Sequence, residues 1–469
     1  MRILQLASEA VPFAKTGGLG DVVGSLTRYL AAAGHDVDLV LPYYRTIAAA
    51  RLADDRRPAL RYTPSELGTV GEGRLVSGPT LDGARTWFVD VPELFDREGL
   101  YGARGADHPD NLLRFAAFVR AAILAMDRLH LAPEVVHCHD WQTALAPVWL
   151  AGTVPTVLTI HNLAYQGWFP AAARLDADVA VGAGLRLPGA ADLWLLRDGL
   201  QAADQVSTVS PTYAAEILRP DLGCGLDDVL RALDPPVVGI LNGIDADVWN
   251  PADDPYLPAG WTATDVSGKR AARGALADTF GFDAPSSLPV FGLVSRLVDQ
   301  KGIGLLAELR PRLETWTGAR FALLGTGEAR YERLFEELDE LPHVAARVAF
   351  DERLAHLVEG GADFFLMPSM FEPCGLNQMI SQRYGTLPIV HRTGGLADTV
   401  TPETGIVFEH FDDAGLEWAI ERALHLYADR AAYARIQAAA MRLDHSWNSR
   451  LPLYEDLYEN VRARHATST

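Results

Sequence analysis

A lysine and a carboxylate flank three glycines in the stretch "KTGGLGDV" near the N-terminus: Lys15 and Asp21 enclose Gly17, Gly18 and Gly20. Glycine lets the backbone approach a ligand closely, and a lysine ammonium is a compact charge with three hydrogen-bond donors. The combination indicates a loop that binds an anionic group such as a phosphate, with Asp21 available to cap the following helix. In the alternative interpretation, the glycines only form the turn and Lys15 points into water.

Lysine is almost absent from the rest of the chain. Lys15, Lys269 and Lys301 are the only lysines, and the other 38 of the 41 basic residues are arginines. Lys15 and Lys301 stand beside glycines in "AKTGG" and "DQKGIG", where a compact ammonium fits a crowded site better than a planar guanidinium. We therefore favour a functional role for these two. Lys269, in "GKR", lacks the Ser or Thr of a phosphate-binding loop, and we expect it to be a solvated surface residue.

Other polar side chains gather in short clusters along the chain. They are His137-Cys138-His139-Asp140, His161-Asn162, Asn242-Gly243, Arg296 with Lys301, Gly325-Thr326-Gly327-Glu328, and Glu372 within "PSMFEPCGLNQM". His137 and His139 alternate along one face of a strand and have the spacing of metal ligands, but no third ligand is suggested. A core or substrate-binding role is therefore preferred for the two histidines, and no metal site is expected. The sequence "GTGE" alone is a weak signal, because it lacks the full dinucleotide-binding pattern.

The elements that carry these clusters form two series of short β-branched runs that alternate with helical stretches. The expected strands of the first series are "RILQLAS", "VDLVLP", "EVVHCHD", "TVLTIHN", "QVSTVS" and "VVGILNG", and those of the second are "PVFGLVSRL", "RFALLGTG", "DFFLMPS" and "TLPIVHR". A helix is expected from Asp21 to about Ala33, stopped by Gly34. The region 45–85 shows no clear pattern. This alternation predicts an α/β fold with two doubly wound, Rossmann-like parallel sheets.

The length of 469 residues suits two domains. We expect an N-terminal domain over 1–245, a C-terminal domain over 246–450 and a terminal helix over 451–469, with a hinge near the proline-rich stretch at 242–260. In open parallel sheets, ligands bind at the carboxyl ends of the strands. Nearly every polar cluster follows an expected strand, so we expect the clusters to converge on a central cleft faced by both sheets.

Composition excludes several classes of partner. The net charge is −20, so the protein as a whole repels polyanions, and neither nucleic acid nor an anionic membrane is an expected partner. No apolar run approaches the ~20 residues of a membrane helix. The three cysteines are too few and too dispersed for a disulfide framework. The N-terminus resembles a strand rather than a signal peptide, so a cytoplasmic location is expected.

Eight stretches together resemble bacterial glycogen synthases and the related plant starch synthases. They are "KTGGLGDV", "HCHDWQTALAP", "TIHNLAYQG", "STVSPTYAAEI", "NGIDADVWNP", "SRLVDQKG", "FEPCGL" and "RTGGLADTV". They occur in order up to about residue 405, and such a set is far more specific than any single motif. The resemblance implies a GT-B fold, ADP-glucose as donor, an α-1,4-glucan such as glycogen as acceptor, and transfer with retention at the anomeric carbon. It also implies that the terminal helix returns to the N-terminal domain, and that neither a cofactor nor a metal is required.

The resemblance assigns roles to individual residues. It places Arg296 and Lys301 against the diphosphate. From the chemistry of the residues themselves we expect Glu372 and His161 near the glucosyl unit and Lys15 on the phosphate side of the donor, and these five are the expected catalytic residues. The alternative for Glu372 is a helix-capping acid. The expected substrate-binding residues are Lys15, Gly17, Gly18, Asp21, Asp140, Asn162, Tyr165, Asn242, Phe350, Cys374, Gly375 and Leu376. A second glutamate that is common among retaining GT-B enzymes is Ile380 here, which removes any two-carboxylate mechanism. Phe350 replaces the tyrosine that commonly stacks on adenine.

Aromatic residues lie near the same clusters. They are Tyr101, Trp141, Tyr165, Trp168 and Phe169. Pyranose faces stack on such rings, although burial in the core explains any one of them equally well.

Three alternatives remain open at this point. A related enzyme would pass glucose from ADP-glucose to glucose 1-phosphate or a short maltooligosaccharide. More distantly, a glucan phosphorylase shares the two-sheet architecture but carries pyridoxal phosphate on a lysine. A non-enzymatic glucan-binding protein is disfavoured, because we expect Lys15, Arg296 and Glu372 to be buried, and burying such charges is costly without a ligand or mutual pairing.

Overall fold

The computed structural model describes residues 1–50, 58–69, 71–103, 105–173, 192–282 and 287–468. The chain divides into two compact units. Unit 1 comprises Met1–Val209, Ala214–Ile240 and Trp447–Thr469. Unit 2 comprises Ser210–Tyr213 and Leu241–Ser446.

Unit 1 is built on a largely parallel sheet. Among its described residues the sheet has nine strands in the order β13-β12-β9-β8-β1-β2-β5-β4-β3. The strands are β1 (Arg2–Leu6), β2 (Asp36–Pro42), β3 (Leu60–Tyr62), β4 (Gly73–Ser77), β5 (Arg85–Asp90), β8 (Val135–His139), β9 (Thr156–Ile160), β12 (Gln205–Thr208) and β13 (Val238–Gly239). All neighbours from β13 to β5 pair in parallel, whereas β4 pairs antiparallel with both β5 and β3. The central strands are buried on both faces, so their polar residues Gln5, His137 and His139 lie in the core together with the apolar ones.

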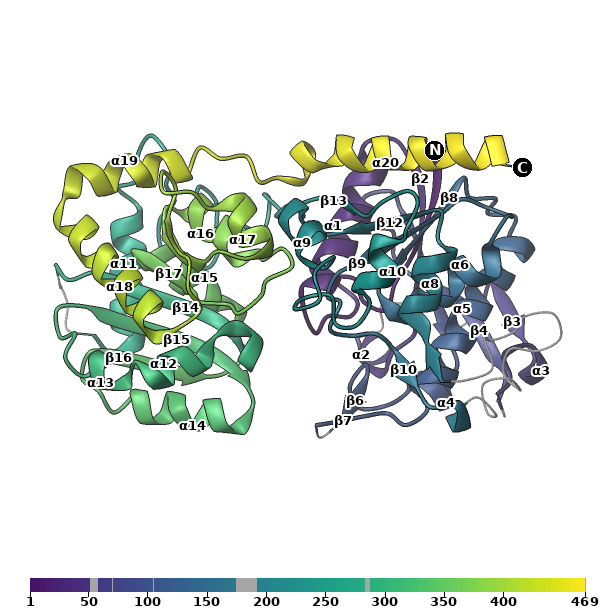
Figure 1. Ribbon diagram of the computed structural model, residues 1–469, viewed down its shortest axis with the longest axis horizontal. Coiled ribbons are helices and arrows are strands. Elements are labelled where there is room, and N and C mark those ends of the chain that lie inside the picture. The colour runs from purple at the N-terminus through teal and green to yellow at the C-terminus, as the bar shows by residue number, and fades with distance from the viewer. Residues whose placement is uncertain (51–57, 70, 104, 174–191, 283–286, 469) are drawn as a thin grey trace. The chain divides into compact units, whose positions relative to one another are not determined.

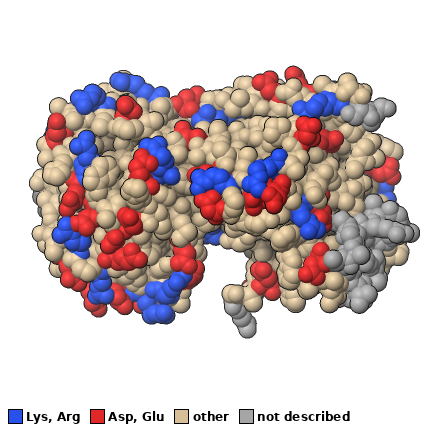
Figure 2. Space-filling model, viewed as in Figure 1, with Lys and Arg blue, Asp and Glu red and all other residues tan. Residues whose placement is uncertain are grey.

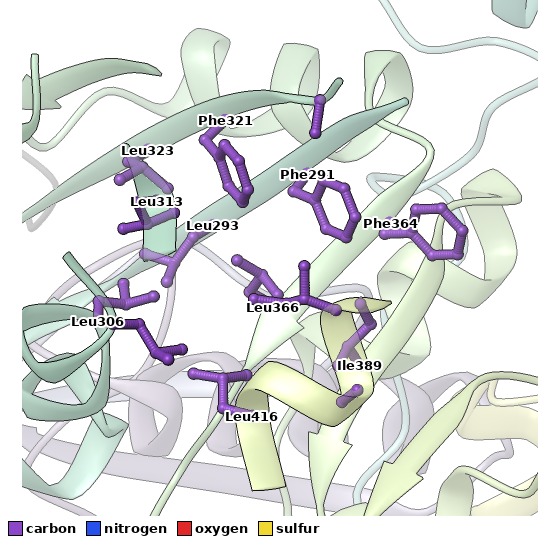
Figure 3. Close-up of a cluster of buried hydrophobic side chains, with 14 of the residues drawn as sticks. Phe291, Leu293, Leu306, Leu313, Phe321, Leu323, Phe364, Leu366, Ile389 and Leu416 are labelled. Atoms are coloured by element: carbon purple, nitrogen blue, oxygen red, sulfur yellow. The ribbon is translucent and has the colours of Figure 1, made fainter. Parts of the chain in front are cut away.

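Unit 2 has a parallel sheet in the order β16-β15-β14-β17-β18-β19. Its strands are β14 (Val290–Leu297), β15 (Arg320–Gly327), β16 (Val344–Val348), β17 (Phe364–Met367), β18 (Leu387–His391) and β19 (Ile406–Phe408). Side chains alternate between two hydrophobic clusters, as the two-residue period of a strand requires. Phe291, Phe321 and Phe364 belong to one cluster (Figure 3), and their neighbours Val290, Ala322 and Phe365 to the other. The sheet is therefore covered on both faces.

Helices connect the strands in both units. The helices before the break between units are α1 (Gly18–Ala32), α2 (Arg45–Ala49), α3 (Pro64–Leu67), α4 (Pro92–Phe95), α5 (Asn111–Arg128), α6 (Leu145–Leu150), α8 (Leu195–Ala202), α9 (Pro211–Glu216) and α10 (Asp227–Arg231). Those after it are α11 (Lys269–Phe280), α12 (Ile303–Glu308), α13 (Arg310–Leu313), α14 (Ala329–Leu338), α15 (Glu352–Gly361), α16 (Asn377–Tyr384), α17 (Gly394–Thr399), α18 (Asp413–Ala428), α19 (Arg430–Ala440) and α20 (Trp447–Ser468). Two short antiparallel pairs, β6 (Gly102–Ala103) with β7 (Ala106–Asp107) and β10 (Trp168–Phe169) with β11 (Leu193–Trp194), complete the described strands.

The last helix, α20, packs on unit 1, where it lies close to the N-terminus (Figure 1). Trp447, Tyr454 and Tyr458 on this helix are buried. Tyr458 accepts a hydrogen bond from Gln5 Nε2 of β1 at 3.2 Å, across 453 residues of sequence. The end of the chain is thus part of the core of the first sheet.

The expected α/β fold with two parallel sheets is confirmed, and all ten expected strands are present. The first helix begins at Gly18, three residues before the predicted start at Asp21, because low helix propensity makes glycines look like loop residues. Gly34 follows the end of that helix with φ +91°, a left-handed conformation that favours glycine, so the predicted stop is confirmed. Strands β5, β16 and β19, together with β3 and β4 in the patternless region, were not predicted.

Basic and acidic side chains are interspersed over the face shown in Figure 2. None of the described helices is both long enough and apolar enough to cross a membrane.

Candidate active site

The loop between β1 and α1 carries Lys15, and hydrogen bonds to the buried side chain of Glu9 hold this loop in place. Glu9 is 2% exposed, and its carboxylate accepts hydrogen bonds from the Thr16 N–H at 2.5 Å and the Thr16 hydroxyl at 2.7 Å. The Tyr101 hydroxyl donates to the same carboxylate at 2.5 Å. Sequence reasoning missed Glu9. The sequence offered one indication: Glu9 is a carboxylate shortly after the first strand and six residues before Lys15.

Lys15 itself lies at the surface of unit 1. Its ammonium pairs with Asp21 at 2.7 Å, and the two side chains are 41% and 33% exposed. The expectation that Lys15 is buried is therefore wrong. Asp21 is also not the helix cap, because Gly17 occupies that position and Asp21 follows in the first turn of α1. A carboxylate in the first turn interacts favourably with the helix dipole and orients Lys15 at the same time.

Gly17 and Gly18 leave open space beside the loop. A Cβ atom added at either position would meet nothing within 4 Å, whereas one added at Gly24 would lie 2.4 Å from the Val11 carbonyl oxygen. Packing within the described chain thus explains Gly24 but neither of the two loop glycines. Gly17 is the N-cap of α1, where glycine is favoured, and the open space at both positions leaves room for a ligand to approach the backbone closely.

Asp140 and His161 meet where β8 and β9 end. The His161 N–H donates to Asp140 Oδ1 at 2.7 Å. Asp140 has φ +57° and ψ −174°, a backbone conformation that few residues other than glycine adopt and that carries strain. Burial raises the pKa of the Asp140 carboxyl to about 7, against the lowering effect of the backbone N–H groups of His161 and Asn162.

His137 and His139 of β8 and His161 after β9 form a group of neighbouring rings. His139 Nδ1 lies 2.9 Å from His161 Nε2, and the rings of His137 and His139 are 4.1 Å apart. Burial lowers the pKa of His161 to about 3 and that of His139 well below its ordinary value. Among the described residues no group of three potential metal ligands is found. His137 and His139 bond to Tyr458, Thr159 and Gln5, which is the core role preferred from the sequence.

The aromatic residues separate into two groups. Trp141 is buried, with its ring 5.1 Å from that of Phe115, and therefore belongs to the core. Tyr165 and Trp168 are 54% and 53% exposed. They follow Asn162, whose side chain accepts a hydrogen bond from the Ala164 N–H at 3.0 Å and so shapes the turn.

Unit 2 brings Lys301 and Glu372 together at the ends of two neighbouring strands. Lys301 follows β14 and Glu372 follows β17, and the ammonium lies 2.5 Å from Glu372 Oε2. The Ser369 hydroxyl donates to the same oxygen at 3.0 Å. The side chains of Glu372 and Lys301 are 7% and 20% exposed. Glu372 is not a helix cap, because α16 begins at Asn377 with Leu376 as its cap residue.

Arg296 lies at the carboxyl end of β14, opposite Thr326 of β15. The residue is exposed, so the expectation of burial is wrong for Arg296 as it is for Lys15. Only Glu372 of the three charges is buried. No ion pair of Arg296 is found within the described part of the chain.

The glycines of "RTGGLADTV" position the backbone of Glu372. Gly394 has φ +42°, and a Cβ atom there would lie 1.9 Å from the Glu372 carbonyl oxygen. The Gly395 N–H donates to that oxygen at 3.1 Å. Sequence reasoning used this motif for the resemblance but assigned no site role to these two glycines.

The remaining candidates of unit 2 lie on its loops. Asn242 is 4% exposed, and its Oδ1 has no hydrogen-bond partner among the described residues. Phe350 is 83% exposed just before α15. Cys374, Gly375 and Leu376 form the turn between Glu372 and α16.

The expectation that Lys269 is a solvated surface residue is wrong. Lys269 is 8% exposed, and its ammonium donates to the carbonyl oxygens of Gly360 and Tyr384 and to the Thr386 hydroxyl at 2.8, 3.2 and 2.7 Å. Burial lowers its pKa to about 7. The side chain joins α11 to the loops around β18, a structural role that local sequence context did not indicate.

Comparisons with known proteins agree with this geometry. The starch synthase catalytic domain family matches residues 2–232, and the glycosyl transferases group 1 family matches residues 278–440. A glycogen synthase of Anaeromyxobacter dehalogenans is 43% identical over 98% of this chain and 100% of its own length. A glycogen synthase of Alkalilimnicola ehrlichii is 45% identical over 98% and 99%, respectively.

Solved structures give the same result. The catalytic domain of starch synthase IV from Arabidopsis thaliana, bound to ADP and acarbose, superposes with a TM-score of 0.87 at 32% identity, covering 98% of this chain and 99% of that one. A sucrose-phosphate synthase from Thermosynechococcus elongatus, at 18% identity and a TM-score of 0.65, shares the fold.

Proposed function

The chain belongs to the family of bacterial glycogen synthases, and on this premise we propose that it transfers glucose from ADP-glucose to the non-reducing end of an α-1,4-glucan with retention of anomeric configuration. The observation that carries the proposal is the ion pair between partly exposed Lys301 and buried Glu372 at adjoining strand ends. One partner is suited to a phosphate and the other to a developing positive charge on a sugar.

Cleavage of the donor creates charge at both ends of the breaking bond. The bond between the anomeric carbon and the diphosphate oxygen breaks, and the electron pair leaves with the diphosphate. Arg296 and Lys301 stabilise that negative charge. Glu372 faces the oxocarbenium-like glucosyl unit, and the turn Cys374–Leu376 offers backbone N–H groups to the donor.

The acceptor completes the reaction on the same face of the sugar. Its hydroxyl oxygen forms the new bond to the anomeric carbon, and its proton passes to the departing phosphate. No second carboxylate is required, which agrees with Ile380 at the position where many retaining enzymes have a glutamate. The donor, the acceptor and the protein therefore supply every group that the bond changes and the proton transfer require.

The remaining polar and aromatic side chains orient the substrates. His161 lies near the glucosyl unit, while Asp140 and Asn162 shape the loop that holds it. Asp21 and Asn242 accept or donate hydrogen bonds to sugar or ribose hydroxyls, and the orphan Oδ1 of Asn242 supports such a role. The exposed ring of Tyr165 stacks on a pyranose and that of Phe350 on adenine.

Lys15 adds a third cation to the phosphate side of the donor. The open space beside Gly17 and Gly18 supports a close approach of the ligand to this loop. Lys15→Arg keeps the charge but enlarges the donor group, so we expect kcat at saturating ADP-glucose to fall on the order of 10- to 100-fold. The unfolding free energy should stay unchanged, because Lys15 is 41% exposed. Steady-state kinetics and denaturant titration measure both; wild-type kinetics would mean that Lys15 is a solvated loop residue.

Activity should not require a metal ion, because the three cations balance the diphosphate charge. We expect the initial rate to be the same in excess EDTA as in untreated enzyme. Loss of activity that Mg²⁺ or Mn²⁺ restores would contradict this expectation.

A donor-by-acceptor matrix tests the proposed function directly. ADP-glucose and UDP-glucose are each assayed with glycogen, maltose and glucose 1-phosphate, and product release is measured. The highest rate is expected for ADP-glucose with glycogen. Preference for glucose 1-phosphate or maltose would favour the small-acceptor alternative, and an absorbance band of pyridoxal phosphate in the purified protein would favour the phosphorylase alternative.

A further inference from the structure

We propose that Tyr458, on the C-terminal helix α20, determines which ring nitrogen of His161 carries the proton, through Gln5 and His139. Tyr458 is then a positioning residue for glucosyl transfer. The inference rests on the proposed function to the extent that His161 faces the glucosyl unit. The hydrogen-bond chain itself is independent of that role.

The chain of contacts is continuous from α20 to the end of β9. Gln5 Nε2 donates to the Tyr458 oxygen at 3.2 Å, and Gln5 Oε1 lies 2.8 Å from His139 Nε2. His139 Nδ1 lies 2.9 Å from His161 Nε2. Gln5, His139 and Tyr458 are all 0% exposed, so water does not compete for these bonds.

The directions of the bonds follow from the Gln5 amide. Because its nitrogen donates to Tyr458, its oxygen faces His139 and accepts a hydrogen bond from His139 Nε2–H. A neutral His139 then has a lone pair on Nδ1, which accepts from His161 Nε2–H. A neutral His161 in turn keeps its Nδ1 lone pair free to accept a hydrogen bond, as from a sugar hydroxyl.

The rings of His137, His139 and His161 are neutral at ordinary pH. Burial lowers the pKa of His161 and of His137 to about 3, and that of His139 well below its usual range. A neutral imidazole carries one proton, so fixing the role of one nitrogen fixes the role of the other. The partner of one ring nitrogen therefore determines whether the other nitrogen of the same ring donates or accepts.

Tyr458 is held in place from its other side. Its oxygen accepts from Gln5 and its proton goes to His137 Nδ1 at 2.8 Å. His137 Nε2 lies 2.6 Å from the Thr159 hydroxyl, which lies 2.7 Å from the Ser207 hydroxyl, so the second ring nitrogen of His137 also has a partner. Burial raises the pKa of Tyr458 above its ordinary value, so the phenol keeps the proton that it donates.

Loss of the Tyr458 hydroxyl removes the group that decides the orientation of the Gln5 amide. A rotated amide would present Nε2 to His139, which must then accept at Nε2 and donate from Nδ1. His161 Nε2 would become the acceptor and the proton of His161 would move to Nδ1. The nitrogen offered to the sugar would change from an acceptor to a donor.

Tyr458→Phe tests the inference, because it removes one hydroxyl and keeps the ring. Tyr62→Phe is the matched control: Tyr62 is 1% exposed in the same unit, and its hydroxyl donates to the Ala121 carbonyl at 3.0 Å outside the chain of contacts. Histidine-selective ¹⁵N NMR of each full-length variant reports the protonated nitrogen of His161, with His161→Gln used to assign its signals. Steady-state kinetics are measured on the same samples.

In wild type and in Tyr62→Phe we expect the proton of His161 on Nε2. In Tyr458→Phe we expect it to move to Nδ1, fully or in part, with kcat lower by roughly tenfold, the worth of one hydrogen bond in the transition state, and an unchanged KM for ADP-glucose. If Tyr458→Phe does not fold, Gln5→Met removes the amide oxygen that accepts from His139 Nε2–H, and the proton of His161 is then expected on both ring nitrogens rather than on Nε2 alone.

Two results would overturn the inference. An unchanged His161 tautomer in Tyr458→Phe would show that α20 does not set it. If the His161 tautomer changes in Tyr458→Phe but kcat equals that of Tyr62→Phe, the position of the proton does not affect glucosyl transfer. The NMR measurement needs no substrate, so a failure of the proposed function in the donor-by-acceptor matrix is distinguished from a failure of the hydrogen-bond chain.

Discussion

Arg296→Ala is expected to lower kcat for glucosyl transfer by about 10²–10³-fold, because it removes a cation from the charge that develops on the leaving diphosphate. The unfolding free energy should change by less than about 0.5 kcal/mol, since Arg296 is exposed and its removal leaves no buried charge without a partner. Single-turnover kinetics and denaturant titration measure the two quantities.

Arg435→Ala serves as the control for Arg296→Ala. Arg435 is an exposed arginine of α19 in the same unit, so its loss changes the net charge equally. We expect wild-type kcat in this variant. Near-normal turnover in Arg296→Ala would instead reject the assignment of Arg296 to the diphosphate.

Lys301→Met is expected to affect both activity and stability. We expect kcat to fall by about 10²–10³-fold, as for Arg296. We also expect the unfolding free energy to fall by about 3 kcal/mol, because removal of one partner leaves the charge of Glu372 buried and uncompensated. Glu372 is 5% exposed, so water cannot replace the lost ammonium easily.

A double variant separates these two effects. In Lys301→Met with Glu372→Gln no buried charge remains, and the Ser369 hydroxyl still has an oxygen to donate to. We expect most of the lost stability to return while kcat stays low. Recovery of activity in the double variant would instead mean that the transfer requires neither the ammonium of Lys301 nor the carboxylate of Glu372.

An exposed ion pair provides the stability control. Arg310 lies 2.5 Å from Glu337, as close as Lys301 lies to Glu372, but the two side chains are 38% and 53% exposed. Arg310→Met should therefore cost less than about 1 kcal/mol. An equal loss of stability in Lys301→Met and Arg310→Met would contradict the argument from burial.

The strands and the places where they end could be predicted from the sequence because both depend on local pattern. The runs that became β8, β9, β14 and β17 are apolar and β-branched, and each is followed by polar residues. Strands β3, β4 and β19 were missed for the opposite reason. None of them is followed by a polar cluster like those that mark β8, β9 and β17, and β3 and β4 lie in a region with no clear apolar pattern, so their formation depends on the strands that they pair with.

Local sequence was a poor guide to burial of charged groups. Lys15 and Lys301 both stand beside glycines, yet Lys15 is 41% exposed and Lys301 20%. Lys269, in an ordinary polar stretch, is more buried than either. The environment of a lysine depends on which carbonyl oxygens and carboxylates the fold brings to it, and for Lys269 these come from residues 91 to 117 positions away.

The sequence by itself determined the fold class, the family and the residue types available at the strand ends, because apolar periodicity and contiguous motifs are properties of neighbouring positions. Only the tertiary structure decided how those residues act together. The Tyr101–Glu9 bond across 92 residues, the Lys301–Glu372 pair across 71 residues and the Gln5–Tyr458 bond across 453 residues all join parts of the chain that no local pattern connects. Hydrogen bonds and ion pairs require atoms within about 3 Å of one another, and it is the packing of the sheets and of α20 that brings such distant positions that close.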